Sequence, residues 1–394
     1  LRLSVLAAVA VLAGPAAAPV GASPVELISR AHPPFPYTTG SSYSPSLSAD
    51  GRYVAFLSGA GNLAPGQADS FAGSDAFLHD RVTGITTLLT HRAGLPSVAT
   101  ESSCVAVQVS ADGRYAAFAS GGTDLVPGQT GSPSFYNLFL YDRLAGTTRM
   151  VSHAAGSPAA GGDGSSTNFR LSQDGRYVAY ESDAKNLVAG LTGPMNSMPQ
   201  VFLWDRDADT TALVSHNHDS PIVTGRFGAF LAAISADGGY VAFNSDSDDL
   251  ISGVTFPTIR QHVFLYARTT GTVSLIDHAS GAPTTPANSG GYVPLGSLSR
   301  DGRFILFESL AGNLLPSPGS PVGTQLYLYD RASGAATLVS HRAGQPDTLS
   351  AGNAQVGTLS TDGRFVAFDS SALDLVAGET GATDNFFLWD RRTG

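Results

Sequence analysis

SADGRYAAFAS, residues 110–120, decides the fold of this sequence, because it returns in five further copies at a nearly fixed spacing. The copies are SADGRYVAFLS (48–58), SQDGRYVAYES (172–182), SADGGYVAFNS (235–245), SRDGRFILFES (299–309) and STDGRFVAFDS (360–370). Successive Asp-Gly pairs lie 62, 62, 63, 64 and 61 residues apart. Self-similarity at such a period indicates a repeat architecture in which each copy is one structural unit.

Each repeat is predicted to form four antiparallel strands. In the second copy, Cys104–Ser110 and Tyr115–Ser120 flank an Ala-Asp-Gly-Arg turn, where Asp and Gly tolerate the positive φ of hairpin turns. A loop rich in Gly, Pro and Ser over 121–136 leads to the third strand, Asn137–Arg143, and Thr148–His153 is the fourth. Four antiparallel strands in every repeat, without a helical period, predict the blade of a β-propeller.

The third strand recurs as Phe-Leu-(Tyr or Trp)-Asp-Arg in three of the six copies, for example in Phe139–Arg143, and with one substitution in each of the others. Apolar residues on both faces indicate a strand that is buried on both faces, as between packed blades. The Asp that follows is expected to accept hydrogen bonds from the next turn. The copy that has Ala267 at this position would lack that bond.

The whole pattern predicts one all-β domain over residues 23–394, a six-bladed β-propeller with four strands per blade. Blades are expected at approximately 43–91, 104–153, 167–216, 229–278, 292–341 and 353–394, the last completed by 25–30. The last repeat stops where its fourth strand should begin, and Val25–Arg30 resembles Thr337–His341. This N-terminal strand is therefore expected to close the ring and remove its exposed edges. The alternative is a protein that continues beyond Gly394 into more blades.

The first 22 residues are predicted to be a secretory signal peptide. Arg2 precedes the apolar run Leu3–Ala13, and Val20-Gly21-Ala22 has the small-x-small form that a signal peptidase accepts. The run is too short for a transmembrane span; an anchor that stays uncleaved is the alternative. The sequence thus predicts a periplasmic or extracellular protein without a membrane span after removal of the signal.

Composition limits the partners. The formal net charge of −10 disfavours nucleic acid and anionic membrane surfaces, which both need patches of Lys and Arg. Cys104 is the single cysteine, so an intramolecular disulfide is impossible, and its apolar strand predicts a buried thiol. We expect a monomer.

Five histidines share one repeat position, at the end of the fourth strand: His91, His153, His216, His278 and His341. That strand lies three strands out from the axis, roughly 15 Å at about 4.8 Å per strand. Because zinc–nitrogen bonds are about 2 Å long, these side chains cannot share one ion. The sequence also shows no nucleophile elbow, P-loop, dinucleotide fingerprint or zinc spacing. No catalytic residue, metal site or cofactor is predicted.

The repeat Ser-x-Asp-Gly-Arg-Tyr-Val-Ala-Phe-x-Ser, followed by Phe-Leu-Tyr-Asp, resembles the repeats of the TolB-like β-propeller family. These six-bladed propellers have WD-like repeats that usually carry Pro-Asp-Gly at the first turn, where this sequence has Ala, Gln, Arg or Thr before the Asp. The resemblance covers residues 25–394. It implies a bacterial envelope or secreted protein, often a module that binds other proteins.

A binding site is expected on one face of the ring. In a four-stranded antiparallel blade, the loops between the second and third strands and the connections between blades emerge together, and both are long here. Long loops on a rigid scaffold commonly carry binding. The expected anchors are Phe71, Phe135, Tyr136 and Phe256, with a protein partner, or a glycan, on this face.

The rival function is a polysaccharide lyase or hydrolase that works in the central channel. It would need ionisable side chains that converge at the axis. The residues just before the first turns are Ser46, Gln108, Arg170, Ala233, Ser297 and Thr358. Arg170 is the ionisable one among them, so it is the candidate residue of the channel.

Overall fold

The computed structural model describes residues 25–33, 38–194, 198–256, 259–294, 296–317, 319–378 and 384–394. The predicted signal peptide lies outside these residues. Within them every regular element is a β-strand, and none is a helix that is long and apolar enough to span a membrane. The predicted all-β class is confirmed.

The strands form five four-stranded antiparallel sheets and one three-stranded sheet, numbered here 1 to 6 in chain order. Sheet 1 contains β1 (Ser42–Leu47), β2 (Tyr53–Ser58), β3 (Asp75–Asp80) and β4 (Ile85–Leu88). Sheet 2 contains β7 (Cys104–Val109), β8 (Tyr115–Ser120), β9 (Asn137–Asp142) and β10 (Thr147–Met150). Sheet 3 contains β13 (Ser166–Leu171), β14 (Tyr177–Ser182), β15 (Gln200–Asp205) and β16 (Thr210–Leu213).

Sheet 4 contains β17 (Ala229–Ile234), β18 (Tyr240–Ser245), β19 (His262–Ala267) and β20 (Thr272–Leu275). Sheet 5 contains β23 (Gly291–Tyr292), β24 (Phe304–Ser309), β25 (Gln325–Asp330) and β26 (Ala335–Leu338). Sheet 6 contains β29 (Ala354–Leu359), β30 (Phe365–Ser370) and β31 (Asn385–Asp390). Four short hairpins lie in the connections: β5 (His91–Arg92) with β6 (Leu95–Ala99), β11 (His153–Ala154) with β12 (Ser157–Gly161), β21 (His278–Ala279) with β22 (Ala282–Pro286), and β27 (His341–Arg342) with β28 (Gln345–Leu349).

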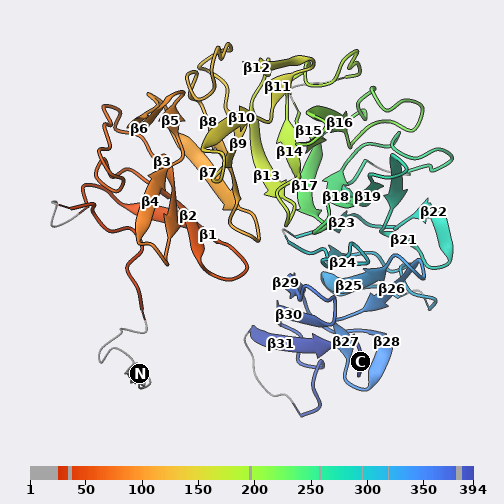
Figure 1. The fold of residues 1–394 in the computed structure, drawn as a ribbon. Coiled ribbons are helices and arrows are strands. Elements are labelled where there is room, and N and C mark those ends of the chain that lie inside the picture. The colour runs from red at the N-terminus through yellow and green to blue at the C-terminus, as the bar shows by residue number, and fades with distance from the viewer. Residues whose placement is uncertain are drawn as a thin grey trace, which may run out of the picture.

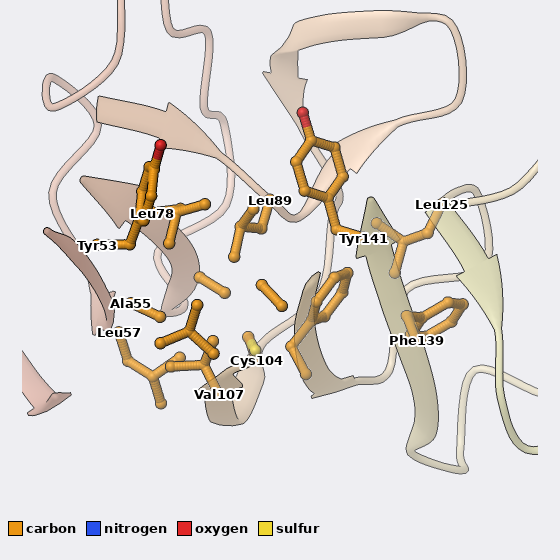
Figure 2. Packing of buried hydrophobic residues seen from close by; sticks show 14 of the residues in the cluster. Tyr53, Ala55, Leu57, Leu78, Leu89, Cys104, Val107, Leu125, Phe139 and Tyr141 are labelled. Carbon is orange, nitrogen blue, oxygen red and sulfur yellow. The ribbon is translucent and has the colours of Figure 1, made fainter. Parts of the chain in front are cut away.

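The sheets stand face to face in an arc, and the first strand of each sheet lies on the inside (Figure 1). Neighbouring sheets bury a core between them. Between sheets 1 and 2 that core contains Leu57, Leu78, Cys104 and Phe139, and Cys104 lies in its middle (Figure 2). The thiol of Cys104 is buried as predicted, and burial raises its pKa. Burial of this apolar surface is the main force that holds sheet to sheet.

A second contact, here called the aromatic clamp, joins neighbouring sheets at their short turns. The first-turn glycine of one sheet, Gly113, lies against the ring of Tyr53 in the preceding sheet, so close that a Cβ at Gly113 would meet it at 1.9 Å. The guanidinium of Arg143 covers the same ring at 4.3 Å from its centroid and donates to the carbonyl of Gly113. Positive φ and close approach both require glycine here (φ 69°).

The same turns are also joined by backbone hydrogen bonds that run around the axis. The residue before each turn Asp donates its N–H to the carbonyl of the equivalent residue in the next sheet. The donors are Ala49, Ala111, Gln173, Ala236 and Arg300, and the last acceptor is Thr361. We call this chain of bonds the turn girdle. It fixes the spacing of the sheets at the channel mouth.

The predicted hydrogen bonds of the third-strand Asp are present. Asp80 accepts from the N–H of Val82 in the following turn and, in addition, pairs with Arg52 of the first turn at 2.7 Å. The bonds from Arg52 hold the pKa of Asp80 well below its usual value. Sheet 4 lacks both partners, because Gly239 and Ala267 stand at the two positions. Because both the Arg and the Asp of this ion pair are replaced in sheet 4, neither charge is left without its partner.

The predicted closing role of Val25–Arg30 is not found in this structure. Sheet 6 has three strands, and the arc is open between sheets 6 and 1 (Figure 1). Residues 25–33 lie on sheet 1 instead: Ile28 packs on its core, Glu26 pairs with Arg81 at 2.8 Å, and the N–H of His32 donates to Asn62. These contacts hold the segment on sheet 1, and in the open arc it does not pair with β31.

Candidate functional site

The long-loop face contains the loops between second and third strands and the connections between sheets, and these segments are ordered by recurring contacts. The side chain of Gln67 accepts from the N–H groups of Leu63 and Ala64 and donates to the carbonyl of Ala60. Gln129 makes the same three bonds one repeat later. These loops are therefore part of the repeat, rather than freely varying insertions.

The hairpins in the connections lie against these loops. Ala68 forms a parallel bridge with Val98, and Thr130 forms one with Ala160. Neighbouring loops thus touch one another across the face, which makes it a continuous surface. The prediction that both classes of long segment emerge on one face agrees with these contacts.

The four predicted anchors differ in exposure. Phe71 is 42% exposed. Phe135 and Tyr136 are half-buried. Phe256 packs onto its own sheet, with its ring centroid 4.8 Å from that of His262. Phe71 is thus the most exposed of the four, whereas Phe256 is partly buried and packs against the core between sheets 3 and 4.

Sequence reasoning missed a set of exposed residues on the inner rim of this face, where the first strand of each sheet begins. The set comprises Tyr43 (48% exposed), Val105 (45%), Phe230 (39%) and Tyr292 (45%), with the exposed polar residues Thr167 and Gln355 at the same position of sheets 3 and 6. Each is the residue after the one that pairs with the last Ser of the second strand. The repeat alignment itself could have identified them, because four of the six are large and apolar.

A hollow of about 450 Å³ adjoins Tyr292 between sheets 4 and 5. Its lining includes Arg260, Glu308 and the backbone of Gly290 and Gly291. Such a hollow, with one exposed aromatic ring and groups of both charges, is suited to hold a side chain of a partner.

A buried His–Asp pair lies in sheet 4 behind this hollow. His262 Nδ1 is 2.8 Å from Asp277 Oδ2, and a Cβ at Gly291 would lie 2.7 Å from the same oxygen. Burial raises the pKa of Asp277, and the bond to His262 opposes that shift. In sheet 3 the equivalent pair is neutral, since Ser215 donates to the side chain of Gln200.

Arg170, the predicted channel residue, lies on β13, the innermost strand of sheet 3 (Figure 1), and its side chain is held by neighbours. Its guanidinium donates to the carbonyl of Phe169 at 2.7 Å and to Asn168 at 3.2 Å. Asn168 in turn donates to Glu181, whose carboxylate also accepts from the N–H of Leu231 in sheet 4. Burial lowers the pKa of Arg170 and raises that of Glu181. This cluster joins sheets 3 and 4, and it places two ionisable side chains, Arg170 and Glu181, near each other.

The short-turn mouth of the channel is a hollow of about 950 Å³ lined by acids of the first turns. Each acid is used locally: Asp112, for example, accepts from Ser110 and from the N–H of Arg114. Among the described residues, no group of three or more His, Cys, Asp or Glu side chains is placed to hold a metal ion.

The aligned histidines have structural contacts. In His153 and His216 one ring nitrogen lies at hydrogen-bond distance from the carbonyl of the next residue, and the other ring nitrogen reaches the following sheet. His216, for example, lies 3.0 Å from the carbonyl of Gly271. These two histidines therefore join neighbouring sheets.

No protein-family model matches the chain, and no curated protein matches it. Solved structures similar to it include TolB from Acinetobacter baumannii, at 15% identity and a TM-score of 0.36 over 75% of this chain and 53% of that one. An oligogalacturonate lyase in complex with manganese matches at 11% identity and a TM-score of 0.42, over 87% of this chain and 75% of that one. The β-propeller domain of the Trilobed protease from Pyrococcus furiosus matches at 9% and 0.33, over 89% and 96%.

These structures include TolB and a β-propeller domain, in agreement with the resemblance that the repeats predicted. The chain spans about half of the TolB chain from A. baumannii. All three TM-scores lie below 0.5, so the matches carry no argument about function.

Proposed function

We propose that this chain is a binding module without intrinsic catalysis, which recognises another protein through its long-loop face. The observation that carries the proposal is the inner rim, where Tyr43, Phe230 and Tyr292 expose aromatic rings at equivalent positions. Exposed aromatic residues that are fixed by a rigid scaffold are typical anchors of protein interfaces. A glycan remains the second ligand class for the same surface.

The proposed setting is a six-bladed ring in the periplasm or outside the cell. The apolar N-terminal run and its small-x-small site support secretion, and the six repeats support six blades. In that ring the rim residues would surround the opening of the channel on the long-loop face, and Phe71 would lie further out on the same face.

The test is site-specific photocrosslinking in the native envelope. A photoreactive phenylalanine analogue replaces Tyr292 in one variant and Leu144, which is 67% exposed at a short turn of sheet 2, in the control. We expect one protein adduct from position 292 and none from position 144. The captured protein should then bind Tyr292→Ala at least about tenfold more weakly than the unmodified chain, as for an interface anchor worth over 1.4 kcal/mol.

Adducts that form from position 144 and not from position 292 would place the site on the short-turn face and refute the proposal. Crosslinks to lipopolysaccharide or peptidoglycan from position 292 would favour the glycan over the protein partner.

The cluster of Arg170, Asn168 and Glu181 favours one second candidate, a polysaccharide-active enzyme that uses the channel. Arg170 and Glu181 supply a cation and a carboxyl of raised pKa in one place. A screen on polyuronide and glycoside substrates tests it. Turnover that is lost in Arg170→Ala, while the variant keeps the unfolding midpoint of the unmodified chain, would overturn the choice of a non-catalytic module.

A further inference from the structure

The face of sheet 6 that turns away from sheet 5 exposes apolar residues that the repeat buries in the other sheets. Leu388 is 70% exposed and Phe386 is 91% exposed. The leucines at the position of Leu388 in the other sheets are at most 3% exposed: Leu78, Leu140, Leu203, Leu265 and Leu328. Each of those leucines faces the following sheet, and sheet 6 has no following sheet in the open arc (Figure 1).

The aromatic clamp shows what should cover this face. It is formed at five junctions, and the arginine lies 4.0 to 4.3 Å from the ring centroid in each. The arginine–ring pairs are Arg143 on Tyr53, Arg206 on Tyr115, Arg268 on Tyr177, Arg331 on Tyr240 and Arg391 on Phe304.

The parts of a sixth clamp are present on the two ends of the arc. Sheet 6 offers Phe365, which is only half-buried. Sheet 1 offers Arg81, which already donates to the carbonyl of Gly51 at 2.8 Å as its counterparts do to theirs. A Cβ at Gly51 would meet only the guanidinium of Arg81, whereas the first-turn glycines of the later sheets lie against an aromatic ring.

The turn girdle is likewise complete except for one link. Five bonds run from Ala49 to Thr361, and the bond that would complete the circle runs from the N–H of Thr361 to the carbonyl of Ala49. Both groups lie at the channel mouth, at the two ends of the arc.

The N-terminal segment already occupies sheet 1 as a preceding sheet would. Ile28 packs on the core of sheet 1, just as Leu89 and Val151 at the equivalent position pack on the sheets that follow them. The N–H of His32 donates to Asn62, and the same bond joins Ala93 to Asp124. The segment therefore makes the contacts with sheet 1 that a fourth strand makes with the following sheet, although it is not paired with β31 of sheet 6.

Sheet 6 has three described strands where the other five sheets have four. No described strand pairs with the outer edge of β31, and a hollow of about 260 Å³ lies there, lined by Val339, Phe368 and Phe387. In sheet 1 the fourth strand places Leu88 opposite Phe77. Leu27 stands at the position of Leu88, three residues before the aligned His or Arg, and it is 62% exposed.

We propose that the exposed face of sheet 6 docks on sheet 1 of the same chain, with Val25–Ile28 added to the edge of β31 as its fourth strand. The interface uses Arg81 over Phe365, a bond from Thr361 to Ala49, and Leu388 against sheet 1. This inference rests on the proposed six-bladed ring and names the contacts that hold it shut. Docking buries the apolar residues that the open arc exposes.

The test compares charged substitutions that are harmless in an open arc and costly in a closed ring. Leu388→Lys and Leu27→Lys each place an ammonium in the docked interface, whereas Leu144→Lys places one at an exposed short turn. We expect both seam variants to lower the midpoint of urea unfolding well below that of Leu144→Lys. Hydrogen exchange of the unmodified chain provides a second readout, in which the amides of β31 should be protected as strongly as those of β25.

Equal midpoints for the three variants, or fast exchange throughout β31, would overturn the proposal. Sedimentation and hydrogen exchange of the unmodified chain are both measured across a hundredfold dilution. A dimer that dissociates on dilution, together with loss of protection of β31, would mean that a second copy covers the face instead. None of these measurements involves a partner, so they can fail while crosslinking from position 292 succeeds, and the reverse.

Discussion

Asp75 is a buried carboxyl at a position where the next sheet has an amide. Its side chain is 4% exposed and accepts a short hydrogen bond from the hydroxyl of Thr90. In sheet 2, Asn137 accepts the equivalent bond from Ser152. Burial raises the pKa of Asp75 to about 7, and the nearby Asp69 adds to the shift. The folded chain therefore binds a proton here that the unfolded chain has released above about pH 4.

This shift predicts how stability depends on pH. Because the folded pKa is raised, the contribution of Asp75 is fully present below about pH 4 and is lost as the pH rises toward 7. Asp75→Asn should remove that loss and raise the free energy of unfolding at pH 8, by up to about 4 kcal/mol for three pKa units. Urea unfolding at pH 4, 6 and 8 measures it.

Asn137→Asp is the matched reverse substitution. It should introduce a stability that falls between pH 4 and pH 7 into sheet 2. If Asp75→Asn instead loses stability equally at all three pH values, the carboxyl is ionised in the folded protein and the interpretation is wrong.

The pair of His262 and Asp277 leads to a second prediction at the same scale. Asp277→Ala should destabilise the fold by about 3 kcal/mol, because it leaves a buried histidine without its partner. The double variant His262→Gln/Asp277→Ser copies the Gln200–Ser215 pair of sheet 3 and should unfold within about 1 kcal/mol of the unmodified chain. Thermal unfolding of both variants decides it. A double variant as unstable as the single one would show that the His–Asp pair itself is required.

At the scale of the sheets, the aromatic clamp can be tested with two glycines that both have positive φ. Gly113 (φ 69°) lies against Tyr53, and Gly84 (φ 71°) has open space around it. Gly84→Ala should cost only the backbone strain of about 1 kcal/mol. Gly113→Ala should cost a further 1–3 kcal/mol, because the new methyl group meets the ring. Equal losses of unfolding free energy would mean that the clamp does not hold sheets together.

The strands were largely predictable because they repeat. The second strand of sheet 2 was predicted at Tyr115–Ser120, as observed, and the third at Asn137–Arg143 against the observed Asn137–Asp142. The predicted fourth strand, Thr148–His153, is divided into β10 and the first residue of the β11–β12 hairpin. That division depends on contacts with the neighbouring sheet, which a strand pattern within one repeat does not contain.

The candidate site was less predictable than the strands. Aromatic type and position in a long loop selected Phe256, which packs on His262, and passed over Phe230 and Tyr292, which stand in strands. Whether an aromatic ring is exposed depends on what lies opposite it in three dimensions. The pairing of Val25–Arg30 with sheet 6 was not found for a related reason. Ile28 packs on sheet 1 whether or not sheet 6 is near, so the sequence pattern of the segment does not decide whether it also pairs with β31.

For the whole molecule, Cys104 provides a natural probe of how the sheets separate. Its thiol is 1% exposed in the core between sheets 1 and 2, and burial disfavours the reactive thiolate (Figure 2). We therefore expect a disulfide reagent to label the thiol in native buffer only slowly, when this junction opens. Gly113→Ala weakens that junction and should speed labelling by about 5–30-fold, the factor for one or two kcal/mol.

The matched control is Gly363→Ala, which places the same strain on the junction of sheets 5 and 6, against Phe304. In repeat proteins stability is held mainly between neighbours, so this variant should leave the labelling of Cys104 nearly unchanged. Equal acceleration by both variants would show that all the sheets open as one unit.

The aromatic clamp also has a consequence for how such a chain could arise. Each repeat of about 62 residues carries both halves of the joint, a ring that receives the next repeat and a glycine and arginine that grip the previous one. Copying or deleting one repeat in the gene therefore creates no mismatched joint. A lineage could gain or lose whole units by unequal recombination, and the number of units would be limited only by the geometry of closing a circle.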